Sequence, residues 1–396
     1  MKSNYRYIVK AFMAMAVIAG TTSCDDFLDR EPMSSISPET YYSTAAQLEA
    51  NLNDEYPNVL PSFGQWTYGI FGEDKGTDNQ IEVNANDRYT QDRWKVPHSE
   101  SDNWKFERIY RINFFLSEAL PKFGEDMSGS QNTISGSVAT IKHYIGEMYF
   151  LRAYEYFKKL QLFGDFPIIN QPLADEMEAL REASKRFPRN EVARFIISDL
   201  DKAYAYMSDV DMATTRINKD AAMLVKSRVA LFEATWLQNF KGTAFVPGGE
   251  GWPGASLHNN YQYPSGNLDN EVKYFLEQAV EASKLVADKY KGNLTENTGV
   301  LQQSADDPSN PYFDMFAQED LSDVKEVLLW RQYARGLSTH NINAAAGRGN
   351  YRIGLTRGFV QNFLMKDGTP VYAHGSYADG DGYYICLLYT SPSPRD

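Results

Sequence analysis

The sequence predicts an all-α protein in which tetratricopeptide-like helix pairs form a scaffold that carries long irregular loops. Three observations support this fold class. Apolar residues recur every three or four positions in several segments, which is the spacing of one helix face. Small residues lie on many of these apolar stripes, so consecutive helices can pack closely as antiparallel pairs. Long polar or Gly/Pro-rich segments separate the helices. A strict repeat of about 34 residues is absent, so the likeness concerns helix pairing.

Two helices are expected in the first third of the chain. Residues 35–56 open the first helix, and Thr44 is followed three positions later by a glutamine. This is the capping-box spacing, which satisfies backbone N–H groups at a helix start. Residues 103–123 have the pattern of the second helix, with Pro121 and Gly124 expected to end it.

Four further helices follow in the central part of the chain. The third is expected over residues 138–169 and is ended by Gly164 and the proline that follows. The fourth follows Arg189, the fifth follows a capping Asn218, and the sixth spans 268–290. The apolar residues that set the helical period are Ile141, Ile145, Met148, Tyr149, Ala153 and Phe157; Val192, Ile196, Leu200, Ala203 and Met207; Ala222, Val225, Val229, Phe232 and Trp236; and Val272, Leu276, Ala279 and Val286.

Residues 63–103 and 241–266 are expected to form long irregular loops. The first segment is rich in Asp, Asn and Gly without a sustained period, and the second is rich in Gly and Pro. A structureless loop that long is uncommon unless it has a function. From about residue 292 the pattern is mixed, and residues 324–334 predict either a strand or a short helix.

The composition excludes several function classes. The net charge of -13 argues against a nucleic-acid partner, because phosphate binding depends on Lys and Arg. Five histidines without ligand spacing and two distant cysteines predict no metal site and no disulfide framework. No nucleophile elbow or phosphate loop is present, so no cofactor is expected. The 26 tyrosines and 6 tryptophans include many in polar, Gly-rich segments, where flat rings can stack on a ligand.

The N-terminus has the pattern of a secretory signal peptide over residues 1–23. Three basic residues precede the apolar run 11–20, which is too short to span a bilayer of roughly 20 apolar residues. Small residues then lead to Cys24, which resembles a bacterial lipoprotein box, although Thr21 stands where leucine is commonest. Cys24 is therefore the expected lipidation site. The alternative is an ordinary secreted protein with an incidental cysteine.

Four regions are expected after the signal peptide. Residues 24–36 form a tether, residues 37–240 an N-terminal helical region, and residues 241–384 a C-terminal region that looks truncated. Residues 385–396 match nothing before them in periodicity or polarity. They read either as a disordered terminus or, as we favour, as a non-native tail from a foreign reading frame, which would make the native protein longer.

Several segments together resemble the SusD/RagB family of outer-membrane lipoproteins. They are CDDFLDREP after the signal peptide, FLRAYEYFKKLQLFGDFPII, AAMLVKSRVALFEATW, VLLWRQYA and GFVQNFLMKDGTPV. They occur in the family's order, and the likeness runs through nearly all of residues 24–375. Family members usually continue well beyond the segment of Asp367, Gly368 and Pro370, whereas this chain stops soon after it.

The resemblance implies a non-catalytic protein that captures a nutrient at the cell surface. It implies an irregular, ligand-facing half on the helical scaffold and a SusC-type, TonB-dependent outer-membrane transporter as partner. Acids directly after the lipidated cysteine resemble an export signal to the outer face of the cell, and Asp25 and Asp26 fit this role. The alternative is that both acids are merely soluble tether residues.

A glycan-binding surface needs flat aromatic faces for sugar C–H groups and polar partners for hydroxyls. The two long loops supply this mixture, and binding residues are often on loops held by a scaffold. Trp104, Trp236 and Trp330 are instead expected in the core. The candidate ligand-binding residues are Trp66, Tyr68, Asn84, Asp87, Arg88, Trp94, Trp252, Tyr261 and Tyr263.

Other functions stay open at this point. One alternative is a peptide ligand in place of a glycan, and another is a structural subunit without direct ligand contact. A surface glycoside hydrolase would need two suitably spaced carboxylates. The acidic cluster of Glu73, Asp74, Asp78 and Asp87 offers carboxylates, but 52 acids make such clusters common by chance. Residues 74–82 carry alternating oxygen donors without the full calcium-loop pattern.

Overall fold

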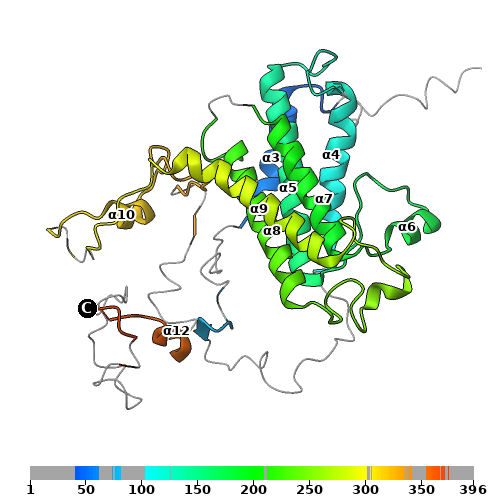
Figure 1. The fold of residues 1–396 in the computed structure, drawn as a ribbon. Helices are drawn as coiled ribbons and strands as arrows, with labels where there is room; N and C mark the ends of the chain where they lie inside the picture. The colour runs from blue at the N-terminus through cyan, green and yellow to red at the C-terminus, as the bar shows by residue number, and fades with distance from the viewer. Residues whose placement is uncertain are drawn as a thin grey trace, which may run out of the picture.

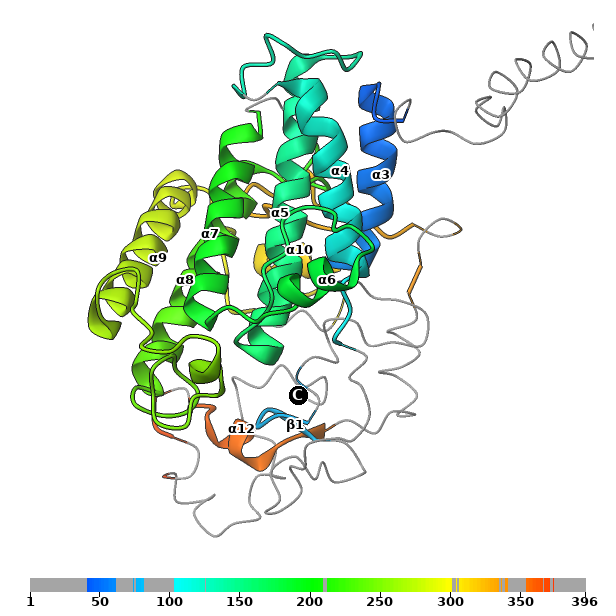
Figure 2. The same ribbon diagram turned by 90° about the vertical axis from the view of Figure 1, so that its right-hand side faces the viewer.

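The structure is a computed structural model in which the helices stand side by side in one array (Figures 1 and 2). Figure 2 shows α3 and α4 at one end of the array, α5 and α7 in the middle, and α8 and α9 at the other end. Each of these helices packs on its neighbours in that order. The structure describes residues 41–61, 74, 76–81, 103–124, 126–208, 212–300, 304, 306–334, 336, 339–340, 354–365, 367–370 and 373.

The first described helix is α3, over Ala45–Val59, and it begins as predicted. Thr44 accepts a hydrogen bond from the backbone of Gln47, and the Gln47 side chain accepts one from the backbone of Thr44. The predicted capping box is therefore confirmed. It satisfies two N–H groups that the helix itself leaves without partners.

Helix α4 spans Glu107–Phe123 and is shorter at its start than predicted. Pro121 was expected to help end this helix, but it lies inside the last turn. Gly124 ends the helix with φ +102, and its N–H donates to the Leu120 carbonyl at 3.0 Å. The positive φ explains why a glycine stands there.

Helix α5, over Val138–Phe163, lies at the centre of the array and contacts α3, α4 and α7. Gly164, one of the two residues predicted to end this helix, does end it, with φ +68. The sequence pattern predicted one buried face. The helix is instead buried nearly all round, since neighbours cover it on three sides.

The remaining long helices match their predicted starts. Helices α7 (Arg189–Tyr206), α8 (Lys219–Asn239) and α9 (Leu268–Tyr290) are joined as consecutive antiparallel neighbours, which confirms the tetratricopeptide-like pairing. Asn218 and Asn267 cap α8 and α9 with their side chains. The predicted apolar positions on these helices and on α5 lie in the core, except Val225, Phe232, Trp236 and Val272, which are half-buried, and Leu276, which is exposed.

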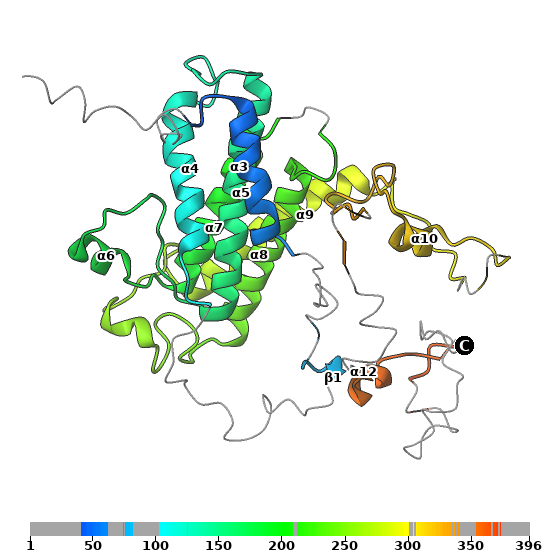
Figure 3. The same ribbon diagram turned by 180° about the vertical axis from the view of Figure 1, so that it is seen from behind.

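Short elements were not predicted from the sequence. Helix α6 has no buried residue, and α10 buries only Met315. Neither helix therefore has the repeated apolar positions from which a helix can be predicted. Figure 3 shows α6 and α10 on opposite sides of the array. The short elements are α6 (Met177–Ala183), the 3-10 turn η3 (Pro253–Ser256), α10 (Pro311–Ala317), α12 (Arg357–Gln361), and strands β1 (Gln80–Ile81) and β2 (Gly354–Leu355), which pair antiparallel.

Residues 324–334 are neither the strand nor the helix that the sequence predicted. Both nitrogens of Trp330 donate to Thr214, the backbone N–H at 3.1 Å and the indole Nε1 at 2.8 Å. Trp330 is therefore held by a connecting segment and is half-buried. Trp104 and Trp236 pack against the hydrophobic core, which confirms their predicted role.

Candidate ligand-binding site

The aromatic loop residues stand on a scaffold held by buried ion pairs. Arg152 of α5 donates to both carboxylate oxygens of Asp199 on α7, at 2.6 and 2.8 Å. Its Nη1 also donates to Asn113 of α4 at 2.9 Å. Arg152 belongs to the segment FLRAYEYF, which carries part of the family resemblance. Its buried side chain joins α4, α5 and α7.

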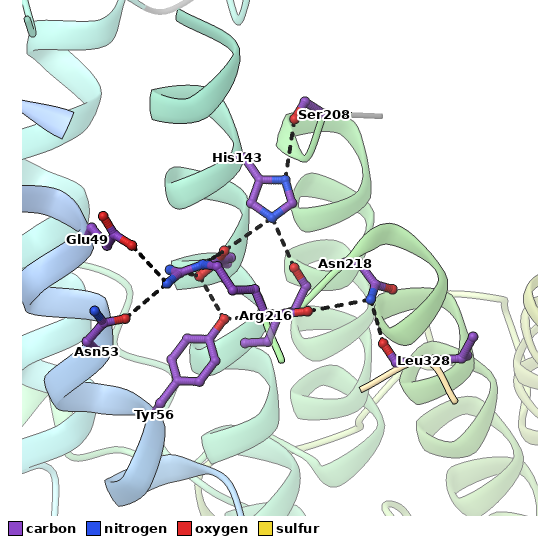
Figure 4. A network of polar contacts seen from close by, with 10 residues as sticks. Glu49, Asn53, Tyr56, His143, Ser208, Arg216, Asn218 and Leu328 are labelled. Atoms are coloured by element: carbon purple, nitrogen blue, oxygen red, sulfur yellow. Dashed lines mark hydrogen bonds and ion pairs between the residues drawn. The ribbon is translucent and has the colours of Figure 1, made fainter. Parts of the chain in front are cut away.

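A second buried network ties α3, α5 and the segment before α8 together (Figure 4). Glu147 accepts from Arg216 and from Tyr56 at 2.8 Å, and His143 Nε2 lies 3.1 Å from Glu147 Oε1. Burial raises the pKa of Tyr56 well above its usual value, and the neighbouring Glu147 carboxylate adds to this rise. Asn218 extends the network to the Leu328 carbonyl at 2.6 Å. The network therefore holds Leu328 at the start of α8.

The turn after α5 connects this scaffold to the loop 241–266. Asp165 accepts from the backbone N–H of Arg189 at 2.9 Å and from Trp252 Nε1 at 2.7 Å. One carboxylate thus fixes both the start of α7 and a tryptophan of the distant loop. Burial raises the pKa of the Asp165 carboxyl, while both hydrogen bonds act in the opposite direction.

Three predicted ligand-binding residues come together in the described part of this loop. The ring centroids of Trp252 and Tyr261 are 5.6 Å apart, and those of Tyr261 and Tyr263 are 5.1 Å apart. Residues from the middle and the second half of the loop therefore form one cluster, which we call the loop cluster: Trp252, His258, Tyr261 and Tyr263.

The expected exposure of the aromatic rings is wrong for Trp252, which is only 4% exposed. Its indole N–H is held by Asp165 and its ring fills the space left by the missing side chain of Gly254. Tyr261 and Tyr263 are half-buried. Burial raises the pKa of both phenols. Contact of these three residues with a ligand stays a prediction.

His258 is the cluster member that sequence reasoning missed. Its ring stacks on Trp252 with centroids 5.9 Å apart and an interplanar angle of 24°. Its Nε2 lies 2.8 Å from the carbonyl oxygen of Arg186, in the segment before α7. A lone histidine in a polar loop has no periodic signal. Its aromatic neighbours Trp252 and Tyr261 in the sequence were the available hint.

Two buried carboxylates on α8 and α9 belong to the scaffold next to the loop cluster. Glu233 of α8 accepts from Arg189 at 2.9 to 3.1 Å, and burial raises the pKa of this carboxyl despite the pair. Glu271 of α9 accepts from Arg194 at 2.7 and 2.8 Å and from Asn190 at 3.0 Å. Burial acts to raise the pKa of Glu271, but these hydrogen bonds and one from Ser265 outweigh it and lower the pKa. Both carboxylates have structural partners.

The other predicted site residues lie outside the described residues, so their placement is not tested. They are Cys24, Asp25, Asp26, Trp66, Tyr68, Asn84, Asp87, Arg88 and Trp94. Within the described ranges, no group of three or more His, Cys, Asp or Glu side chains is arranged to hold a metal ion. No helix in the same ranges has the length and apolarity needed to cross a membrane.

The helical array and the matching sequence define a SusD-like protein. The family model SusD-like_3, described as starch-binding and associating with the outer membrane, matches residues 26–231. The match covers more than half of the chain, and the chain belongs to this family. The predicted family resemblance is confirmed.

Curated relatives and solved structures agree with this assignment. SusD-like proteins P25 and P2 of Formosa agariphila are each 25% identical, over 54% and 61% of this chain and 41% and 46% of theirs. The chain thus spans less than half the length of these relatives. Two SusD-like crystal structures from Bacteroides fragilis have TM-scores of 0.50 and 0.52 at 15% and 18% identity. They cover 85% and 86% of this chain and 57% of their own, and show the fold alone.

Proposed function

We propose that the protein is a surface-exposed lipoprotein that binds oligosaccharides or polysaccharide and delivers them to a TonB-dependent outer-membrane transporter of the SusC type. Membership of a family described as starch-binding and outer-membrane associating carries this proposal. The loop cluster supports it, since aromatic rings with a few polar groups are typical of ligand sites. One of the Bacteroides fragilis structures is named a SusD-like carbohydrate binding protein.

The membrane attachment belongs to the same proposal. Cys24 carries the lipid, and Asp25 and Asp26 direct the protein to the cell surface. Several acyl chains, at about 0.8 kcal/mol per buried CH₂, hold a protein stably on a membrane. A short segment separates Cys24 from the first described residue, Tyr41, so the helical array stays close to the outer membrane and its transporter.

In this proposal the protein is not an enzyme. Glycoside hydrolysis needs one carboxylic acid and one carboxylate placed on either side of the scissile bond. Near the loop cluster, Asp165, Glu233 and Glu271 each accept hydrogen bonds from structural partners, and Glu191 interacts with the Tyr261 phenol. Asp165, Glu233 and Glu271 therefore stabilise the scaffold. The affinity comes from aromatic stacking and hydrogen bonds, at about -4 to -8 kcal/mol for millimolar to micromolar binding.

Retention on immobilised polysaccharides tests the proposed function. The protein from Asp25 onward is applied to starch, laminarin, xylan and galactomannan and to an immobilised peptide library, and released reducing ends are assayed in the same wells. We expect retention by at least one polysaccharide without product. Product release would show a hydrolase, and retention by a peptide library alone would replace the glycan with a peptide. Co-purification with a SusC-type transporter from outer membranes tests the delivery step.

A further inference from the structure

A small apolar surface lies beside the loop cluster and is not among the residues predicted to bind ligand. It consists of Phe187, Leu257 and His258, which we call the Phe187–His258 surface. Phe187 is 38% exposed and Leu257 is 54% exposed, while the His258 ring is half-buried. The rings of Phe187 and His258 have centroids 6.4 Å apart. Two chain segments that are far apart in the sequence thus build one surface.

Both segments hold this surface in a fixed position. Phe187 exchanges two backbone hydrogen bonds with the buried Phe166, at 3.0 and 3.1 Å. His258 Nε2 donates to the Arg186 carbonyl oxygen at 2.8 Å, so Nε2 carries a proton and the ring cannot turn freely. A surface fixed in advance loses little conformational entropy when it binds a ligand.

The ring of the buried Trp252 packs against the His258 ring and supports it. The two rings stack at 24° with centroids 5.9 Å apart. Trp252 has no freedom to leave this position, because Asp165 holds its N–H and a Cβ at Gly254 would lie 2.2 Å from its ring. The buried indole therefore sets where the half-buried His258 ring lies.

We propose that the Phe187–His258 surface contacts the apolar face of a pyranose ring, and that Asp165 is a positioning residue that acts through Trp252. This inference rests on the proposed function and deepens it. It transfers ligand contact from the buried Trp252 to the Phe187–His258 surface. Asn259, Asn260 and Gln262 are exposed close by in the chain and offer amide partners for sugar hydroxyls.

The neighbouring groups favour a neutral ligand. The amide side chains carry no charge, and the Arg186 guanidinium lies 4.5 Å from the centre of the Trp104 ring. That cation is thus already placed over an aromatic face. Exposed apolar side chains beside amide groups suit a ligand with both C–H faces and hydroxyls.

The positioning role of Asp165 is tested without a ligand. Asp165→Asn keeps the side-chain shape but places an amide group against one of two N–H donors. We expect acrylamide to quench tryptophan fluorescence more strongly in Asp165→Asn than in the wild type. The increase should vanish when Trp252→Phe is also present. Equal quenching in the wild type and Asp165→Asn, with both proteins folded by circular dichroism, would overturn this role.

Ligand contact is tested on the four polysaccharides named above. Phe187→Ala and His258→Ala should each lower retention about tenfold, whereas Phe316→Ala should not change it, because Phe316 is 73% exposed on the distant α10. If the wild type is retained and both variants are retained equally well, this inference is wrong and the proposed function stands. If the wild type binds no polysaccharide, the proposed function and this inference are both wrong. Loss of peptide retention instead would overturn the ligand class.

Discussion

The Glu147 carboxylate and the Arg216 guanidinium form a two-pronged ion pair inside the protein, with Nε–Oε1 at 2.9 Å and Nη2–Oε2 at 2.7 Å. Glu147 is fully buried, and Arg216 also donates to Asn53 of α3 at 3.0 Å. The pair thus joins α3, α5 and the segment that leads into α8 (Figure 4). Buried charges are tolerated only when such partners are present.

Glu147→Gln should strongly destabilise the protein. It removes the buried charge that pairs with Arg216 and leaves only the more exposed Glu49 carboxylate at 3.5 Å. Breaking a buried pair typically costs about 3–5 kcal/mol. Urea unfolding followed by circular dichroism measures the change. Glu178→Gln is the matched control, because Glu178 is 76% exposed and pairs with Arg181 at 4.0 Å. An effect of Glu147→Gln as small as that of the control would contradict the role of the pair.

The long helices could be predicted because each carries an apolar period that local sequence displays. Val192, Ile196 and Leu200 recur at helical spacing and are all buried. The full burial of α5 could not be predicted in this way. Its buried polar residues, such as Glu147 and Arg152, find partners on α7 and before α8, which only the folded chain brings close.

The residues of the loop cluster could be predicted only in part from the local sequence. The aromatic composition of residues 241–266 indicated ligand-binding rings, and the structure brings Trp252, Tyr261 and Tyr263 together, which the sequence did not predict. The burial of Trp252 depends on Asp165, which is 87 positions away in the sequence. No local pattern contains that contact, so exposure was wrongly expected.

Glu271 should make stability depend on pH under acidic conditions. Its pKa is lowered in the folded protein, so the unfolded chain binds a proton at higher pH than the folded one. The stabilisation is therefore complete above the unfolded pKa of about 4.3 and is lost as the pH falls through the folded pKa. We expect the stability difference between wild type and Glu271→Gln to shrink between neutral pH and pH of about 3.

Urea unfolding at several pH values measures this difference. Glu277→Gln serves as the control, since Glu277 is 64% exposed and lies 3.7 Å from Lys273 on the same helix, α9. Its effect should stay small at every pH, because exposed pairs contribute little. A constant difference between wild type and Glu271→Gln across the range would contradict the assigned pKa shift.

Gly254→Ala should displace Trp252 from its position. A Cβ at residue 254 would lie 2.2 Å from Cζ2 of the indole, and Trp252 is too buried to move without breaking its hydrogen bond to Asp165. Overpacking of this kind costs typically about 1–3 kcal/mol. A fall in melting temperature together with stronger acrylamide quenching is the expected result. Gly292→Ala is the matched control, because a Cβ there meets nothing within 4 Å. If both variants melt and quench alike, the Trp252 ring does not lie against Gly254 in solution. Trp252 then does not fix the position of the His258 ring.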